Sequence, residues 1–159
     1  MPDLREVLES MGHSAVSTYI QSGNVVFDST ERKSSALGTQ IEGAIARSFG
    51  LKIDVVVRSA RELHTAMAAN PFLDSSSGNT ALHVVFLSDA PDAARLATID
   101  RTRFAPEEFA IGRREVYLHL PDGIGRSKLT AALGPKLAPS IATVRNWNTV
   151  TKLAEMAKR

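Results

Sequence analysis

The chain has 159 residues, 43% of them hydrophobic, which is typical of one compact domain or of two small halves sharing a core. It contains no cysteine, which excludes disulfides, thiolate nucleophiles and thiolate metal sites and fits a cytoplasmic location. The 19 basic and 17 acidic residues leave a net charge of +2, too small to attract nucleic acid without a local cluster. The apolar runs are strand-sized, so no membrane partner is expected.

The first predicted half, residues 1–73, alternates helices with short strands. Apolar residues at helical spacing predict the helices, and β-branched and aromatic runs predict the strands. In chain order these are a helix ending at Gly12, a hairpin or one bulged strand over 16–27, a helix over 37–49, a buried strand over 53–57 and a helix ending before Pro71. Ser59 and Glu62 form a capping box ahead of that last helix.

A polar, glycine-containing segment over residues 74–80 is the predicted linker, and residues 81–159 form the second half. The second half again alternates the two kinds of element. In chain order it contains a strand over 82–87, a helix over 92–99, a hairpin of 104–111 and 115–120, a helix from Ser127 to Gly134–Pro135, a strand over 142–147 and a final helix capped by Asn148.

This order predicts an α+β fold of two ferredoxin-like βαββαβ halves, with antiparallel or mixed sheets and helices packed on one face. The second half runs strand, helix, strand, strand, helix, strand, helix. The first half runs through the same series starting at the helix, so its opening strand is predicted to be missing. A missing strand leaves a sheet edge uncovered, and such an edge pairs readily with another chain, for example in a homodimer.

Four stretches carry a resemblance to a known family. They are TYIQSGNVVF at 18–27, NPF at 70–72, VYLHLPDGIGRSKL at 116–129 and RNWNTVTKL at 145–153. Together they resemble a bacterial family of unassigned activity, domain of unknown function 1697, along nearly the whole chain. Members of that family begin with a strand and a glycine-containing turn ahead of the first helix, so the resemblance implies the same missing strand. It implies no reaction, because the family has no established one.

The first candidate site is the glycine-rich turn at Gly123, Gly125, Arg126, Ser127 and Lys128. Its glycines permit a tight turn, its serine is placed to cap a helix, and the backbone N–H groups at a helix start attract anions. The two cations beside it favour a phosphate ligand. The turn does not match the Walker pattern, and the alternative is an ordinary strand-to-helix turn with a serine cap.

The second candidate site is the segment of Arg145, Asn146 and Trp147. An arginine and the chain's single tryptophan, interleaved with amides, are suited to stacking on and hydrogen bonding a base. Alternatively, Trp147 is a core anchor and Arg145 is solvated. The two candidates would reinforce each other if their strands were neighbours.

Two further groups are candidates for polar contacts with a ligand. Tyr19, Gln21 and Asn24 surround a glycine turn, which either recognises a ligand or satisfies its own backbone. Tyr117 and His119 alternate onto one face of their strand, and this pattern predicts a face that is wet or directed at a ligand.

The leading hypothesis from the sequence is a cytoplasmic binding module for a phosphate-bearing ligand, either nucleic acid or a nucleotide. One alternative is an interaction or dimerising protein that uses the uncovered edge. The other is an enzyme acting on a phosphorylated small molecule, with His119 or Tyr117 as proton donor. The four histidines lack metal-site spacing, so neither a metal nor a cofactor is predicted, and the sequence identifies no catalytic residue.

Overall fold

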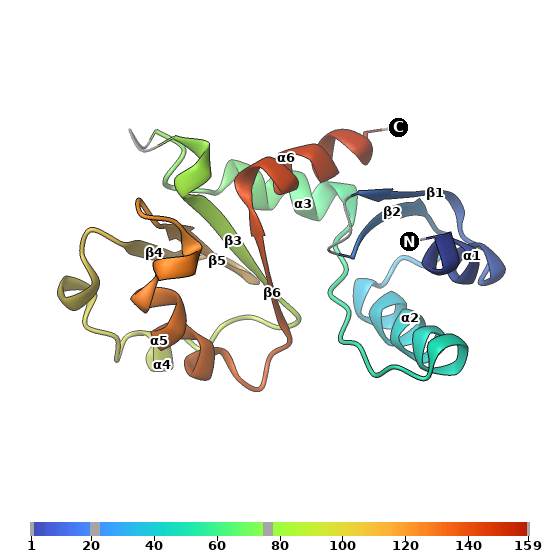
Figure 1. Cartoon of the computed structure of the whole chain (residues 1–159), viewed down its shortest axis with the longest axis horizontal. Coiled ribbons are helices and arrows are strands. Elements are labelled where there is room, and N and C mark those ends of the chain that lie inside the picture. Colours follow the sequence, from blue (N-terminus) through green and yellow to red (C-terminus); the bar gives the residue numbers. More distant parts are fainter. Residues whose placement is uncertain (1, 20–22, 75–77, 159) are drawn as a thin grey trace.

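The computed structural model describes residues 2–19, 23–74 and 78–158, and it shows an α+β fold with two antiparallel sheets (Figure 1). The helices are α1 (Pro2–Ser10), α2 (Ser34–Phe49), α3 (Ala60–Ala68), α4 (Ala93–Leu96), α5 (Lys128–Leu137) and α6 (Trp147–Met156). The strands are β1 (Ser14–Tyr19), β2 (Asn24–Asp28), β3 (Leu82–Leu87), β4 (Glu108–Ile111), β5 (Glu115–His119) and β6 (Ala142–Asn146). Short 3₁₀ turns occur at Asn79–Ala81, Arg101–Phe104 and Ile124–Arg126. None of the helices in the described ranges is both long and apolar enough to cross a bilayer.

The second half is a complete ferredoxin-like unit. Its four-stranded sheet has the order β4-β5-β3-β6, so β3 lies in the interior, antiparallel to both β5 and β6. Every residue of β3 is buried. Val85 and Leu87 pack towards α4 and α5, whereas Val84 and Phe86 pack towards α3 and α6. The run of apolar residues in this strand therefore reflects burial on both of its faces.

The first half has a two-stranded sheet in which β1 pairs antiparallel with β2. The predicted run over 16–27 is therefore two paired antiparallel strands rather than one bulged strand, with a register irregularity between Ser14 and Ser17. Helices α1 and α2 cover one face of this small sheet, where Leu8, Val16, Ile41 and Ile45 form its core. Gly50 takes the left-handed conformation (φ +66°) that ends α2, as the predicted stop after residue 49 requires.

Residues 53–57 are not the buried strand that their sequence predicted. They are extended but belong to no sheet, and Ile53 is 46% exposed. Their counterpart in the second half is β6, whose strand partner is β3. The described part of the first half contains no counterpart of β3, so this segment has nothing to pair with. The side chain of Glu42 accepts the N–H of Val55 instead (2.9 Å).

Two other boundaries differ from the prediction. Strand β4 begins at Glu108, because Asp100 caps a 3₁₀ turn at Arg101–Phe104 where a strand was predicted from residue 104. Helix α5 continues through Pro135 to Leu137 instead of ending at Gly134–Pro135. A proline inside a helix costs about 3 kcal/mol. The buried side chain of Leu137 and the hydrogen bond from Arg95 to the Pro135 carbonyl (3.0 Å) offset this cost.

Helices α3 and α6 lie across the two halves (Figure 1). Leu63 of α3 packs with Trp147 and Val150 of α6 against the second sheet. Helix α6 also contacts β2 of the first half. Each half ends in one of these helices: α3 follows residues 53–57, and α6 follows β6. The two halves are therefore joined by the terminal helix of each.

Candidate functional site: a groove between β2 and residues 53–57

The glycine-rich turn has a cap, and one of its backbone donors is already taken. Residues 124–126 form a 3₁₀ turn, and the Ser127 hydroxyl accepts the N–H of Thr130 (3.0 Å) at the start of α5, as its position predicted. The N–H of the preceding residue, Leu129, donates to the Glu107 carboxylate (3.1 Å). A carboxylate from the chain itself therefore already lies at the place where an anion would bind.

The three residues of the second candidate segment lie in different places. Trp147 lies in the core, Asn146 caps a helix, and Arg145 lines the groove described below. Trp147 is buried in the core between α6 and the second sheet. Asn146, rather than the predicted Asn148, caps α6 by accepting the N–H of Thr149 (2.8 Å). The physical reason is that Asn146 has extended backbone angles (φ −72°, ψ 162°), whereas Trp147 is already helical.

Tyr117 does not face a ligand surface. Its side chain is buried beneath α3, where its hydroxyl donates to the carbonyl of Ala66 (2.6 Å). Burial, with a smaller contribution from Glu115, raises the pKa of Tyr117 to about 12. The expectation that this strand face is wet is therefore wrong for Tyr117, because α3 and α6 cover it.

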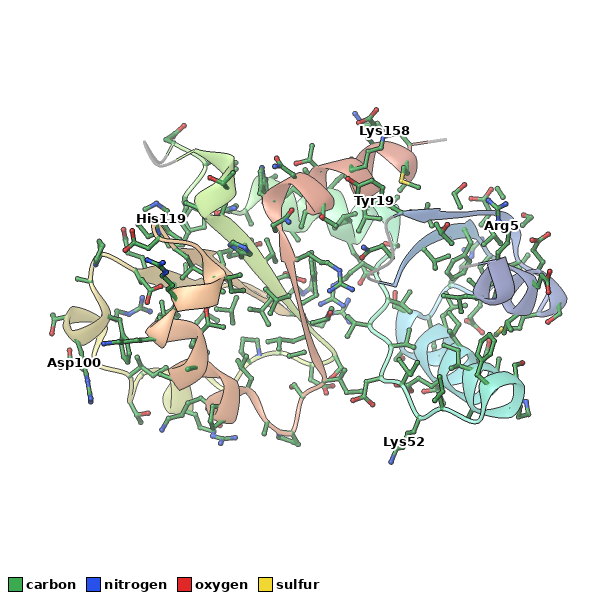
Figure 2. All side chains as sticks on the ribbon, in the orientation of Figure 1. Arg5, Tyr19, Lys52, Asp100, His119 and Lys158 are labelled. Atoms are coloured by element: carbon green, nitrogen blue, oxygen red, sulfur yellow. The ribbon has the colours of Figure 1, made fainter. Side chains whose placement is uncertain are left out.

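His119 lies at the end of β5, and Figure 2 shows it in the half opposite to Tyr19. Its ring stacks on Phe72 (centroids 5.8 Å apart), and its Nδ1 is 3.5 Å from a carboxylate oxygen of Glu108. The predicted turn and the Arg145 strand are not neighbours, since β3 lies between β5 and β6. Two strand spacings, about 10 Å, separate β5 from β6.

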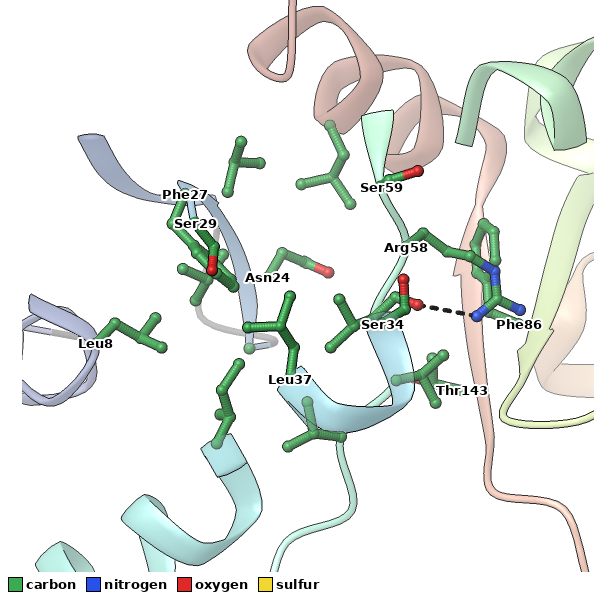
Figure 3. Close-up of a pocket in the computed structure, with 18 of the residues that line it drawn as sticks. Leu8, Asn24, Phe27, Ser29, Ser34, Leu37, Arg58, Ser59, Phe86 and Thr143 are labelled. Carbon is green, nitrogen blue, oxygen red and sulfur yellow. Dashed lines mark hydrogen bonds between the residues drawn. The ribbon is translucent and has the colours of Figure 1, made fainter. Parts of the chain in front are cut away.

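A groove of about 1080 Å³ lies between β2 and residues 53–57, where the first half faces the second (Figure 3). On one side it is lined by apolar side chains of α1 and α2, including Leu8, Leu37 and Ile41. On the other side it is lined by Leu153 of α6 and by Phe86 of the second sheet. The groove therefore separates β2 from the backbone of residues 53–57. Apolar side chains line its two remaining sides, one towards α1 and α2 and the other towards α6 and the second sheet.

The charges that line the groove are balanced. Among the described lining residues, the charged side chains are Arg32, Arg58 and Arg145 against Asp28, Glu31 and Asp54. A groove with equal numbers of both signs does not concentrate anions. Its chemistry suits a largely uncharged ligand.

Two residues from separate sequence-predicted sites meet beside the groove. The Nε of Arg145 donates to the buried side-chain oxygen of Asn24 (2.6 Å), and Asn24 in turn donates to the carbonyl of Tyr19 (3.3 Å). Burial lowers the pKa of Arg145. The third member of the predicted turn, Gln21, lies outside the described residues. The contact joins the hairpin of the first half to β6 of the second.

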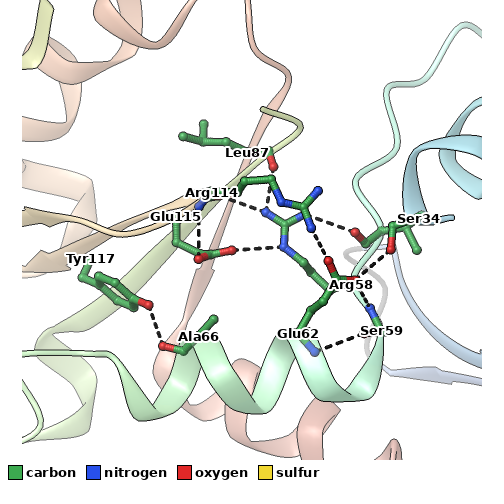
Figure 4. A network of polar contacts seen from close by, with 10 residues as sticks. Ser34, Arg58, Ser59, Glu62, Ala66, Leu87, Arg114, Glu115 and Tyr117 are labelled. Atoms are coloured by element: carbon green, nitrogen blue, oxygen red, sulfur yellow. Dashed lines mark hydrogen bonds and ion pairs between the residues drawn. The ribbon is translucent and has the colours of Figure 1, made fainter. Parts of the chain in front are cut away.

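Arg58 forms a second connection between the halves, which the sequence analysis missed (Figure 4). Its Nε donates to Glu115 (3.1 Å), and its Nη2 donates to the carbonyls of Leu87 (2.7 Å) and Arg114 (2.9 Å). Burial and the nearby Arg114 lower the pKa of Arg58, while Glu115 raises it. The side chain of Arg114 pairs with Glu62 of the capping box.

A short repeat in the sequence would have identified Arg58. Val57-Arg58-Ser59 and Val144-Arg145-Asn146 have the same order of valine, arginine and helix cap. Ser59 and Asn146 are the N-caps of α3 and α6. The arginine that precedes each cap therefore occupies an equivalent place in the two halves.

Comparisons with known proteins agree with this fold. The chain is similar to the solved structure of conserved bacterial protein SP0830 from Streptococcus pneumoniae, with a TM-score of 0.77 and 20% sequence identity over 99% of this chain and 88% of that chain. At this identity the similarity shows the fold alone. No curated protein matches the chain. The model of a family described as "Protein of unknown function (DUF1697)" matches residues 1–117, and the chain therefore belongs to that family.

Proposed function

We propose that this chain is an interaction module whose groove accepts one extended, apolar polypeptide strand. The observation that carries the proposal is the pair of incomplete backbone edges along the groove. In the described residues, β2 has a strand partner on one side only, and residues 53–57 have none. A segment lying between them gains main-chain hydrogen bonds from both edges, as peptides do when they add a strand to a sheet.

The lining of the groove favours this occupant over a phosphate-bearing ligand. Its balanced charges match an uncharged segment, and its helix-borne side chains offer apolar contacts. The glycine-rich turn is the poorer candidate for binding, since Glu107 already accepts the N–H of Leu129. Of the alternatives raised by the sequence, an interaction protein in the bacterial cytoplasm has the most support.

A single linear segment suits the groove better than a folded second copy does. The groove is bounded by β2 on one side and by residues 53–57 on the other. An edge strand that is still part of a sheet carries neighbouring strands about 4.8 Å away, and these would collide with one wall. The groove therefore suits a single extended, apolar stretch of polypeptide better than a folded second copy.

A binding titration tests the proposal. The probe is a fluorescent peptide containing LHVVFL, the sequence of β3, flanked by lysines for solubility. We expect saturable binding by fluorescence anisotropy, strongly weakened by Val26→Asp on the groove wall. The matched control is Ser17→Asp, which lies opposite Val26 on β1 but does not line the groove, and which should leave binding intact.

A labelled single-stranded oligonucleotide and light scattering provide the outcomes that would overturn the proposal. Binding of the oligonucleotide without binding of the peptide would support a phosphate-bearing ligand instead of a peptide. A dimer that excludes the peptide would assign the groove to a second copy. Peptide binding that is equally insensitive to both aspartate variants would place the contact outside the groove.

A further inference from the structure

Going beyond that proposed function, we infer that Arg101 closes the outer edge of the second sheet and thereby prevents a second copy of the chain from pairing there. The edge is β4, which in the described residues pairs with β5 on one side and with no strand on the other. It lies at the end of the sheet that is away from the first half (Figure 1). An edge strand presents unpaired backbone groups to other chains unless something covers them.

The hairpin between β4 and β5 determines which backbone groups of β4 point outwards. The N–H of Gly112 donates to the carbonyl of Glu115 (2.7 Å), so these two residues form a hydrogen-bonded pair. Bonded and non-bonded pairs alternate along antiparallel strands. Ala110 therefore bonds to β5, whereas the N–H and C=O groups of Phe109 and Ile111 are directed away from it.

Arg101 occupies one of these outward groups. Its Nη1 donates to the carbonyl of Phe109, and its guanidinium lies over the Phe109 ring, 3.8 Å from the ring centroid. Both the hydrogen bond and the attraction of the cation to the ring hold the arginine at the edge. A strand that paired with β4 would have to displace it from the Phe109 carbonyl.

A hydrogen-bonded turn positions the arginine. Arg101 begins the 3₁₀ turn that ends at Phe104, and Asp100 is the N-cap of this turn. One carboxylate oxygen of Asp100 accepts both the N–H (3.1 Å) and the hydroxyl (2.6 Å) of Thr102. The backbone from which Arg101 extends to β4 is therefore held by the cap.

The opposite edge of the sheet shows the same arrangement. The N–H of Ser88 donates to the carbonyl of Ile141 (2.8 Å), so by the same alternation the carbonyl of Val144 in β6 points away from β3. That carbonyl accepts a hydrogen bond from Nη1 of Arg145 (2.8 Å). At each edge of the second sheet, an arginine of the same chain thus occupies an outward carbonyl.

Once uncovered, the β4 edge is complementary to a second copy of itself. When two copies pair antiparallel about Ala110, Phe109 of one copy lies opposite Ile111 of the other, and their outward groups form hydrogen bonds. The same register places Glu107 of one copy opposite Arg113 of the other, so opposite charges meet at both ends. The side chain at the centre is a single methyl group, and Ile111, which is 39% exposed, becomes covered.

Sedimentation equilibrium of the natural chain and two variants tests the inference. Arg101→Ala uncovers the Phe109 carbonyl. The matched control is Arg103→Ala, which removes the same charge from the same turn and leaves Arg101 in place. We expect Arg101→Ala to dimerise at least about tenfold more tightly than the natural chain, and Arg103→Ala to behave like the natural chain.

Disulfide trapping identifies the edge that pairs, since the chain has no natural cysteine. Ala110→Cys is combined with Arg101→Ala, because the central residues of the paired strands would lie about 4.5 Å apart between Cα atoms, within disulfide range. Glu108→Cys combined with Arg101→Ala is the control, since its two thiols would be about 14 Å apart along the strands. We expect the cysteine at position 110 to cross-link at least about tenfold faster than the control, and faster than Ala110→Cys with Arg101 intact.

A folded Arg101→Ala variant that stays monomeric would overturn the inference, and so would a dimer that does not cross-link through position 110. Circular dichroism checks the folding of each variant. If Arg101→Ala does not fold, Asp100→Ala decides, because it keeps the arginine and removes the cap of its turn. Combined with Ala110→Cys, it should cross-link faster than Ala110→Cys alone, and an equal rate would overturn the inference. Peptide binding in the groove should be the same with and without Arg101, so the proposed function is tested separately.

Discussion

Arg58 and Arg145 occupy equivalent positions in the two halves, and each extends into the other half. The Nε of Arg58 donates to Glu115 at the start of β5, and the Nε of Arg145 donates to Asn24 at the start of β2. Both acceptors are buried. Each half thus donates one arginine hydrogen bond to the other half. The acceptor of Arg58 is a charged carboxylate, and the acceptor of Arg145 is a neutral amide.

That difference predicts unequal costs for removing the two arginines. Arg58→Met leaves the buried carboxylate of Glu115 without its cation and should lower the free energy of unfolding by about 3–5 kcal/mol. Arg145→Met leaves a neutral amide and should cost about 1–2 kcal/mol. Urea denaturation of the two variants measures both values.

A double variant shows whether the unpaired charge causes the larger loss. Adding Glu115→Gln to Arg58→Met removes the buried charge, so it should restore part of the lost stability. The two single substitutions would then be clearly non-additive, as expected for residues in contact. Equal costs for Arg58→Met and Arg145→Met, or strict additivity in the double variant, would contradict this account.

The sequence predicts the fold correctly where the residues of one element are enough to determine its conformation. The apolar run of β3 and the capping box of Ser59 and Glu62 are confirmed at their predicted residues. Residues 53–57 have an equally good strand pattern, yet they are not a strand in the structure. Strand formation needs a partner for the backbone, and the presence of a partner cannot be read from the segment itself.

The candidate site was predictable only in fragments. Asn24 and Arg145 were each singled out for local reasons, but their contact spans 121 positions of the chain and depends on how the halves dock. Arg58 was missed, because an arginine before a helix cap looks solvated until its buried acceptor is known. The groove itself is formed by the relative placement of elements and has no motif.

The position of the α6 cap can be checked with two neighbouring asparagines. Asn146→Ala removes the side-chain acceptor of the Thr149 N–H and should cost about 1 kcal/mol of stability. Asn148→Ala changes an exposed helical position and should be close to neutral. Thermal and urea unfolding of the pair decide the question, and the reverse ranking would restore Asn148 as the cap.

Two glycines of α2 should respond in opposite directions. A Cβ at Gly38 would lie 3.3 Å from the carbonyl oxygen of Val55, so Gly38→Leu should push residues 53–57 outward, cost about 1–3 kcal/mol and weaken peptide binding. A Cβ at Gly43 meets only the flexible end of Arg47, so Gly43→Ala should stabilise by up to about 1 kcal/mol. Urea denaturation and the peptide titration measure both effects, and the same sign for both variants would argue against a close approach of helix and segment at Gly38.

Stability should fall as the solution becomes acidic, and His83 should be one cause. Burial lowers the pKa of His83 below its ordinary value of 6.5, so the unfolded chain takes up a proton that the folded chain resists. The contribution of His83 is fully present above pH 6.5 and is lost as the pH falls from there towards the folded-state pKa. Urea denaturation at several pH values should show a shallower decline between pH 6.5 and 5 for His83→Leu than for the natural chain. Parallel curves would exclude His83 as the source.

A copy of the β3 sequence tethered ahead of residue 1 should stabilise the first half. A copy of residues 82–87 is placed ahead of residue 1 through a flexible Gly-Ser linker of about ten residues. It can then enter the groove antiparallel to β2, bury apolar surface on both faces and raise the Tm by roughly 5–10 °C. The tethered strand should also abolish binding of the free peptide, because its effective concentration is high. The control carries proline at two central positions of the added strand, which removes ladder hydrogen bonds at nearly the same length. If both fusions raise the Tm equally, the gain does not come from a strand in the groove.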